Sequence, residues 1–229
     1  VDEDDGRGGP PGVLEGRFGF LNVYCRDVDP SRLTDRLGGE WRTLTSTLKR
    51  YACHITAHVP VTAALELKAQ HGFAGGDVAQ VVVAGSEKML SHHNITEPRD
   101  LMMAQYSTPF CVALSLFFDP TDPRSFSQER LEDPAVRALA RATRMELREA
   151  APGDTALASR VTLRLKDGRE FTREAQDFEG MPGRPLDRAR LAAKFRSLTQ
   201  GNDWVRPDAL IERLENLEAV PDASRLFEG

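Results

Sequence analysis

Hydrophobic positions change their spacing along the chain, and each spacing predicts an element. Apolar residues recur at helical spacing between positions 61 and 69. Pro60 fits the first turn of a helix, because its missing N–H would have no partner there, and Gly72 provides a stop. The pattern therefore predicts a helix from about His58 to His71.

Two further segments predict buried elements. A β-branched run at residues 78–83, bounded by Gly76 and Gly85, is typical of a strand. The segment at 110–118 is apolar on nearly every face, which indicates a helix in the interior. Ser107 precedes it and is expected to be its N-cap.

The second half of the chain predicts a hairpin. Apolar and polar residues alternate at 160–165, which is the period of a half-exposed strand. Asp167 and Gly168 then form a turn signal, and residues 170–173 return. Elsewhere we expect short helices at 31–37, 127–131 and 135–142, a strand at 146–148, a polar connection at 91–94, a linker at 180–185 and two amphipathic helices after it.

Strands and helices do not alternate regularly in this order, so an α+β fold is favoured over a doubly wound sheet. The strands and their helices lie between about residues 48 and 180, with helical segments on either side. We expect a flexible lead-in at residues 1–12 and the end of a helical domain at 13–47. A small α+β domain follows at 48–180, and helices at 181–229 return to the helical domain.

Composition narrows the class of protein. The 229 residues are 40% hydrophobic and 28% charged, which is globular, and the net charge is -5. No basic stripe favours nucleic acid, and no apolar run approaches the roughly 20 residues of a membrane span. Three cysteines without close pairing and an acidic N-terminal run, unlike a signal peptide, predict a cytoplasmic protein.

Groups that can transfer protons are concentrated at residues 49–58. Lys49, Cys53, His54 and His58 bring one ammonium, one thiol and two imidazoles to the start of the predicted helix, which favours anions. A histidine moves protons near neutral pH, and a nearby lysine holds a carboxylate or stabilises an enolate. The run indicates acid–base chemistry on a carboxylated substrate. The alternative is a polar loop whose histidines satisfy local hydrogen bonds.

Metal binding is not favoured. His54 and His58 have the H-x3-H spacing of zinc ligands on a helix, but no acidic residue completes an H-E-x-x-H pattern. Pro60 argues against one helix that holds both histidines. His92 and His93 would join them only through a tertiary approach, so no metal site is expected.

The remaining reactive side chains each have two interpretations. Cys53 next to His54 suggests a nucleophile and its base, but neighbours on an extended segment point to opposite faces, so a buried thiol is favoured. Tyr106 either offers its phenol to a site or packs as an aromatic. Arg184, in the linker, either reaches an acidic substrate or stays solvated.

Four segments in the same order resemble the MmgE/PrpD family, whose members include 2-methylcitrate dehydratase and cis-aconitate decarboxylase. One of them contains the proton-transfer groups, and the others resemble the family's LEG…GF, AQFSLPY and G.P.NPLS…KF segments. They are KRYACHITAH at 49–58 continuing into AALEL at 63–67, LEGRFGF at 14–20, AQYSTPF at 104–110, and GRPL at 183–186 with KF at 194–195.

The resemblance implies a mainly helical domain, a smaller α+β lid, here residues 48–180, and an active site between them. It implies elimination or decarboxylation of a small polycarboxylate substrate without a cofactor or a metal. Lys49 and His54 match the family's active-site lysine and histidine by position. His58, Tyr106 and Arg184 are further candidates for substrate binding.

The sequence also departs from the family pattern. Phe110 stands where the family has a tyrosine, and CHITAH at 53–58 lacks the arginine of the family's CCRYTH run. Only the C-terminal half of the family is covered. The resemblance therefore implies that an N-terminal half or a partner chain of the same enzyme completes the site, in a homo- or hetero-oligomer such as a dimer.

Two other functions remain open. Isomerisation or epimerisation of a dicarboxylate uses the same proton abstraction on the same scaffold. A non-catalytic binding or assembly subunit would keep the fold, and Phe110 is consistent with that alternative. The presence of both Lys49 and His54 argues against it.

Overall fold

The computed structural model describes residue 9 and residues 11–222, and by its internal contacts the chain divides into two units, Val1–Ser46 and Thr47–Gly229. The predicted lead-in at 1–12 lies mostly outside the described residues. In the first unit the described helix is α1 (Phe20–Tyr24), and short 3-10 turns follow at Pro30–Leu33 and Arg42–Thr45.

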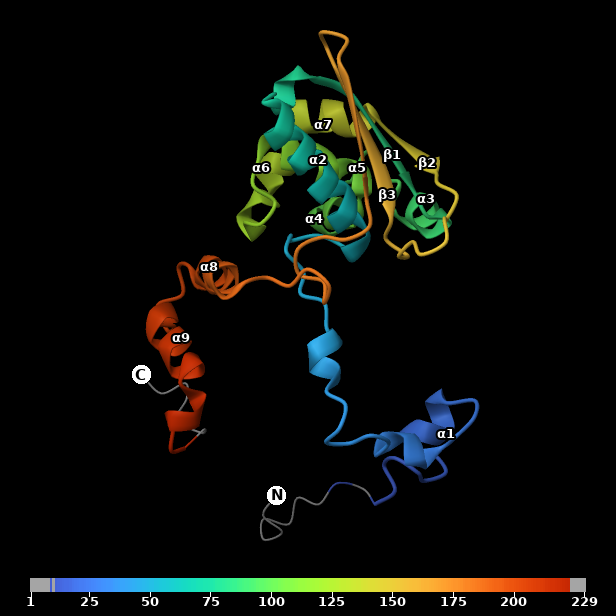
Figure 1. Cartoon of the computed structure of the whole chain (residues 1–229), viewed down its shortest axis with the longest axis vertical. Coiled ribbons are helices and arrows are strands. Elements are labelled where there is room, and N and C mark those ends of the chain that lie inside the picture. Colours follow the sequence, from blue (N-terminus) through green and yellow to red (C-terminus); the bar gives the residue numbers. More distant parts are fainter. Residues whose placement is uncertain (1–8, 10, 223–229) are drawn as a thin grey trace. The chain divides into compact units, whose positions relative to one another are not determined.

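A four-stranded mixed sheet forms the centre of the second unit, in the order β2-β1-β3-β4 (Figure 1). The central strand β1 pairs in parallel with β2 and antiparallel with β3. β3 and β4 form the predicted hairpin around Gly168. The strands are β1 (Val78–Gly85), β2 (Thr143–Leu147), β3 (Ser159–Leu165) and β4 (Glu170–Ala175).

Helices cover one face of this sheet. α2 packs on β3 and β4, whereas α5 and α7 pack on the side of β1 and β2 (Figure 1). The intervening chain forms shorter helices around them. The helices are α2 (His58–His71), α3 (Glu87–His93), α4 (Leu101–Tyr106), α5 (Thr108–Phe117), α6 (Gln128–Leu131) and α7 (Pro134–Arg141). This arrangement confirms the predicted α+β class.

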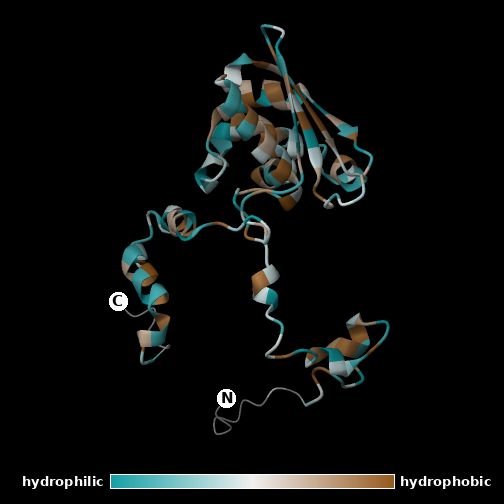
Figure 2. Cartoon of the chain, viewed as in Figure 1, coloured by the Kyte–Doolittle hydropathy of each residue, from teal (hydrophilic) through white to brown (hydrophobic). Residues whose placement is uncertain are grey.

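The core lies between that helical layer and the sheet. α5 is buried along most of its length, as its uniform apolar character predicts, and its hydrophobic residues lie inside the unit (Figure 2). Ser107 caps it as predicted, accepting a hydrogen bond from the Phe110 N–H at 2.9 Å. Burial of this helix fixes the segment before it, which contributes to the site described below.

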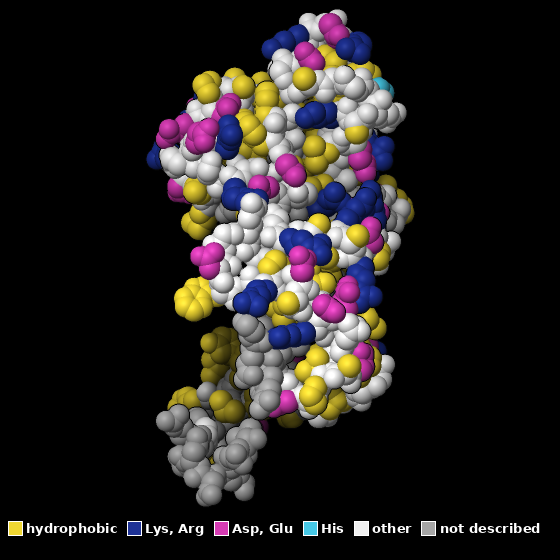
Figure 3. All heavy atoms as spheres, turned by 90° about the vertical axis from the view of Figure 1, so that its left-hand side faces the viewer, with side chains coloured by type: hydrophobic (Ala, Val, Ile, Leu, Met, Phe, Trp, Pro, Cys, Tyr) yellow, Lys and Arg dark blue, Asp and Glu magenta, His cyan; other side chains and the backbone are white. Residues whose placement is uncertain are grey.

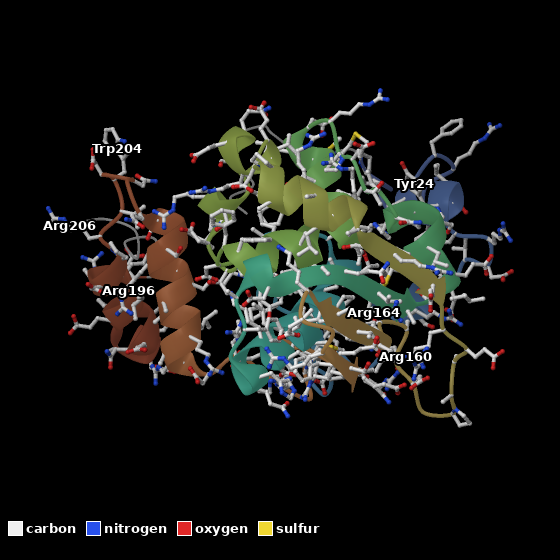
Figure 4. The ribbon with its side chains drawn as sticks, turned by 90° about the horizontal axis from the view of Figure 1, so that it is seen from above. Tyr24, Arg160, Arg164, Arg196, Trp204 and Arg206 are labelled. Carbon is white, nitrogen blue, oxygen red and sulfur yellow. The ribbon has the colours of Figure 1, made fainter. Side chains whose placement is uncertain are left out.

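The opposite face of the sheet is polar. Arg160 and Arg164 lie on β3 between buried residues and are exposed (Figure 4). Arg164 bridges the neighbouring strands, because its Nε donates to Glu170 at 2.6 Å and its Nη1 donates to Gln80 at 2.9 Å. The alternation read from the sequence is therefore that of a sheet with one buried face.

The turn after β4 is tied to the segment that precedes the site. The Leu48 N–H donates to the Gly180 carbonyl at 2.8 Å. Gly180 has φ +119°, and a Cβ there would collide with the Leu48 carbonyl, so this close approach requires glycine. Residues 47–50, which belong to no helix or strand, run past this turn and continue into the site.

Two amphipathic helices, α8 (Arg188–Thr199) and α9 (Pro207–Glu215), follow the turn as expected. They contain no fully buried residue, and Leu191 and Leu198 of α8 are exposed. Exposed hydrophobic side chains lie among charged ones on the face shown in Figure 3. Trp204, in the loop between these helices, is 94% exposed (Figure 4).

Several sequence predictions are corrected. Residues 31–37 do not form the expected helix; a 3-10 turn at Pro30–Leu33 forms instead, capped by Asp29. The expected polar connection at 91–94 mostly belongs to α3, which Ser86 caps. The hydrophobic pattern did not predict the helix α4 at Leu101–Tyr106. None of the helices in the described part of the chain has the length and apolar character needed to cross a membrane.

Candidate active site

The proton-transfer run borders a hollow of about 230 Å3 at the end of the α+β unit. One side is formed by the segment between residues 47–50 and α2, and the other by the end of α4. We call it the His54 hollow. It is lined by Lys49, Tyr51, Ala52, Cys53, His54, Gln105 and Tyr106.

His54 is held in this hollow by both its backbone and its ring. Its N–H donates to the Gln105 carbonyl at 2.8 Å, which joins the two sides. Its Nδ1 lies 3.0 Å from the Thr56 hydroxyl and accepts the Thr56 backbone N–H at 3.4 Å, as the cap of the 3-10 turn Ile55–Ala57. A ring nitrogen that accepts an N–H carries no proton in the neutral imidazole. The proton of neutral His54 therefore sits on Nε2.

Two aromatic rings fix the plane of that imidazole. The His93 ring stacks on it with centroids 4.3 Å apart, and the Tyr106 ring lies at 4.7 Å. His93 is buried, and its Nδ1 donates to the Tyr106 carbonyl at 2.9 Å. The stack therefore links α3, α4 and the proton-transfer run.

The electrostatics of the hollow keep His54 uncharged. Partial burial lowers the pKa of His54 below its usual 6.5, and the positive charges of His93, Lys49 and Lys88 lower the pKa further. The neutral Nε2–H form consequently dominates at neutral pH in the absence of ligand. An anionic ligand would oppose both effects and raise the pKa of His54.

Lys49 supplies the cation of the hollow. It lies five residues before His54, and its side chain is exposed. Among the described residues, none of the ion pairs engages its ammonium. Lys49 and His54, the two residues singled out as catalytic candidates, therefore line the same hollow.

The three further candidates fall in different places. Tyr106 lines the hollow and is 48% exposed, so its phenol is available to a ligand. His58 is fully buried; its Nε2 accepts the Tyr51 N–H at 3.2 Å and its Nδ1 donates to the His54 carbonyl at 3.1 Å. Arg184 pairs with Glu66 and Asp177. The structure does not bring His58 or Arg184 into the hollow, so we carry neither into the proposed site.

Phe110, which replaces the family tyrosine, lies inside α5 and is 1% exposed. It does not line the hollow, whereas Tyr106 does. A phenol is thus present at the site although position 110 lacks one.

Two thiols lie side by side beneath the hollow. Cys53 and Cys111 are both buried, as expected, but Cys53 also lines the hollow. A hydrogen bond from Cys111 lowers the pKa of Cys53 to about 6, and His58 contributes in the same direction at 3.8 Å. Burial raises the pKa of Cys111. The Cys111 S–H also has two backbone carbonyls in reach, that of Ala104 at 3.3 Å and that of Gln105 at 3.6 Å.

Sequence reasoning missed Thr56, His93 and Gln105. Thr56 is only two residues from His54, but histidine is not among the usual cap residues, so no local signal marked their contact. His93 and Gln105 lie 39 and 51 residues from His54, and only the tertiary fold brings them to it. Within the described residues, the side chains of His, Cys, Asp and Glu nowhere form a group of three placed to hold a metal.

Comparisons with known proteins identify a family and relatives of this chain. Residues 51–214 match the MmgE/PrpD C-terminal domain. The chain is 27% identical to a cis-aconitate decarboxylase of Aspergillus terreus over 95% of its own length and 48% of that protein. It is 25% identical to the cis-aconitate decarboxylase of Homo sapiens over 93% of its length and 46% of that protein.

The chain spans about half the length of the curated relatives it matches. The matched region begins at Tyr51, beside the His54 hollow, and extends into α9, so it includes the whole sheet and its helices. By this match the chain belongs to the MmgE/PrpD family and contains its C-terminal domain.

Proposed function

We propose that this chain forms one wall of the active site of a lyase that acts on a small polycarboxylate, with His54 as the proton-transfer group and Lys49 as the carboxylate anchor. The observation that carries the proposal is the hydrogen bonding of His54. With Nδ1 turned to Thr56, the proton-bearing Nε2 is the ring nitrogen left for a ligand. Two relatives in sequence are cis-aconitate decarboxylases, which supports the same class of enzyme.

The chemistry follows from what each step needs. Decarboxylation breaks a carbon–carbon bond, releases CO2 and leaves the electron pair on the substrate carbon or its enolate. That charge requires a cation beside it and a proton donor in reach. Lys49 supplies the cation, and the Nε2 of His54 supplies the proton. A bound polycarboxylate raises the pKa of His54, so the imidazolium becomes available when substrate is present.

The sequence relatives favour decarboxylation over dehydration, because both are named as cis-aconitate decarboxylases. The state of the His54 ring does not separate the two reactions. The imidazolium that donates a proton and the neutral ring whose Nε2 removes one both carry a proton on Nδ1. The Thr56 hydroxyl, 3.0 Å from Nδ1, is placed to accept that proton in either case. We therefore place decarboxylation first. Dehydration and isomerisation or epimerisation of a dicarboxylate stay as second outcomes of the same site.

The site needs a further wall. The His54 hollow is open, and α4, whose last residues line it, also exposes Met102 at 68% and Leu101 at 37%. We propose that an N-terminal half, on the same gene product or on a partner chain, covers the hollow and excludes water. Residues 48–180 would then be the lid, and residues 13–47 and 181–229 would belong to the helical domain.

A binding or assembly subunit without catalysis is the rival function. Incubating the complete protein with cis-aconitate, 2-methylcitrate and a dicarboxylate in D2O, with NMR detection, separates these outcomes. We expect loss of CO2 from one substrate, with deuterium at the carbon that lost it. Loss of water, or deuterium exchange alone, would favour the second outcomes. Saturable binding of all three without any turnover would support the binding subunit and contradict the proposal.

A further inference from the structure

A second hollow, of about 190 Å3, lies on the other side of the segment that carries Lys49. Lys49 and Arg50 are consecutive in the chain but line different hollows. Lys49 lines the His54 hollow, and Arg50 lines the second one together with Arg190 and Lys194 of α8. We call this second site the basic hollow.

Positive charge exceeds negative charge in the basic hollow. Its one buried carboxylate, Glu179, pairs with both Arg50 and Arg190. Asp187, on the exposed side, lies 3.8 Å from Arg190 and also caps α8. Three cationic side chains thus face two carboxylates, and Lys194 is not in any ion pair of the described residues.

One donor in the hollow has no acceptor, and a second donor has protons to spare. The Nε of Arg50 is buried and has no hydrogen-bond partner among the described residues. The ammonium of Lys194 donates to one acceptor, the Lys49 carbonyl, and has two further protons. Burial lowers the pKa of Lys194, and the Lys49 charge lowers it further. A buried donor without an acceptor costs stability, and an anion would remove that cost.

We propose that the basic hollow binds a small oxyanion, a phosphate or a carboxylate group, between Arg50, Arg190 and Lys194. Arginine forks and a lysine ammonium are the groups that recognise such oxyanions, and the Ser197 hydroxyl in the lining adds a donor. The bound anion offsets the excess positive charge and joins α8 to the segment at residues 49–50. This site is independent of the reaction proposed for the His54 hollow.

The test is calorimetric titration of the 229-residue chain at constant ionic strength, with inorganic phosphate in one arm and citrate in the other. We expect saturable binding to one site in at least one arm, and the arm that binds identifies the kind of oxyanion. Lys194→Gln keeps the two arginine pairs with Glu179 intact and should weaken binding by about tenfold, the usual effect of losing a charged hydrogen bond. Arg190→Gln should do the same.

Arg188→Gln is the matched control. Arg188 lies on the same helix but pairs with Glu215 and does not line the hollow, so its loss should leave binding unchanged. Circular dichroism confirms that each variant is folded. A second readout is protection of Lys194 from amine acylation by the bound anion, measured by mass spectrometry. Absence of saturable binding in both arms, or binding that Lys49→Gln abolishes and Lys194→Gln does not, would overturn the proposal.

Discussion

The imidazole of His54 stacks on the imidazole of His93, with ring centroids 4.3 Å apart and the rings inclined by 25°. His93 is buried and anchored by its Nδ1 to the Tyr106 carbonyl, so it cannot move away when His54 takes up a proton. Two imidazoles at this distance disfavour each other's charged forms. The stack is therefore both a support for the His54 ring and a cause of its lowered pKa.

Replacing His93 with phenylalanine keeps a ring on His54 but removes the second charge. Burial continues to lower the pKa of His54, whereas the contribution of His93 disappears. The pKa of His54 should therefore rise toward its usual value, and its protonated form should persist to higher pH. NMR titration of the histidine ring protons in the 229-residue chain measures this change.

His92→Phe is the control for that titration. His92 is exposed and hydrogen-bonded to Ser91, and its ring does not stack on His54. The His92 variant should therefore leave the pKa of His54 unchanged. A His54 pKa that stays unchanged or falls in the His93 variant would show that the stack does not set it.

Thr56 is predicted to be a positioning residue for His54. Thr56→Val removes the hydroxyl at 3.0 Å from Nδ1, so the imidazole turns more freely and the Nε2–H tautomer loses part of its preference. In the complete protein we expect kcat to fall by about tenfold or more, with a smaller change in KM, since general acid catalysis depends on position.

Thr56→Ser restores the hydroxyl and should restore most of the rate. Nitrogen-15 NMR of the ring reports the tautomer independently of turnover. Equal rates and equal tautomer populations in the valine and serine variants would contradict the positioning role.

Cys53 should be the more reactive of the two buried thiols. With a pKa of about 6 it is mostly thiolate at neutral pH, and it lines the hollow, whereas burial raises the pKa of Cys111. Iodoacetamide should label Cys53 faster than Cys111, at a rate that increases with pH through about 6 and then levels off. Peptide mass spectrometry separates the two sites.

The Cys111 hydrogen bond is the largest cause of this pKa, so two variants isolate it. Cys111→Ala removes the donor, which should raise the pKa of Cys53 and slow its labelling at neutral pH. Cys111→Ser keeps a donor and should label at close to the wild-type rate. Faster labelling of Cys53 in the alanine variant would refute this explanation.

Ser107 connects the fold to the site. It caps α5 by accepting from the Phe110 N–H, and its hydroxyl donates to the Ile95 carbonyl in the loop that follows α3. Ser107→Ala leaves a buried N–H and a carbonyl without partners, so it should lower the free energy of unfolding by about 1–3 kcal/mol. Urea unfolding measures the loss. Ser127→Ala, at the cap of the one-turn helix α6, should cost less, and equal losses would contradict the double role.

Local patterns predicted the elements that local physics determines. The helix from His58 to His71, the buried helix after Ser107 and the hairpin at Gly168 follow from hydrophobic spacing, a cap and a turn signal. β2 was expected at 146–148 and begins earlier, at Thr143, because its register is set by parallel pairing with β1. That pairing depends on residues some 60 positions away and has no local signature.

The candidate site shows the same difference between what local sequence predicts and what only the tertiary fold determines. Lys49 and His54 were recognisable because they are close in sequence, and the structure places both at one hollow. His58 is equally close, but the turn at Ile55–Ala57 directs its ring into the core, where the Tyr51 N–H and the His54 carbonyl take both nitrogens. Spacing alone does not separate these two histidines. The direction of each ring depends on the turn, and the stack with His93 depends on the tertiary fold.

The most direct test of the proposed role of His54 is turnover by the complete protein in which His54 is replaced by glutamine, which keeps a hydrogen-bond donor but cannot transfer a proton. The measurement is the rate of CO2 release from cis-aconitate, or from whichever polycarboxylate the wild-type protein converts. We predict a fall in kcat of about a hundredfold or more, with substrate binding retained through Lys49. A variant that releases CO2 at the wild-type rate would contradict the assignment of proton transfer to His54.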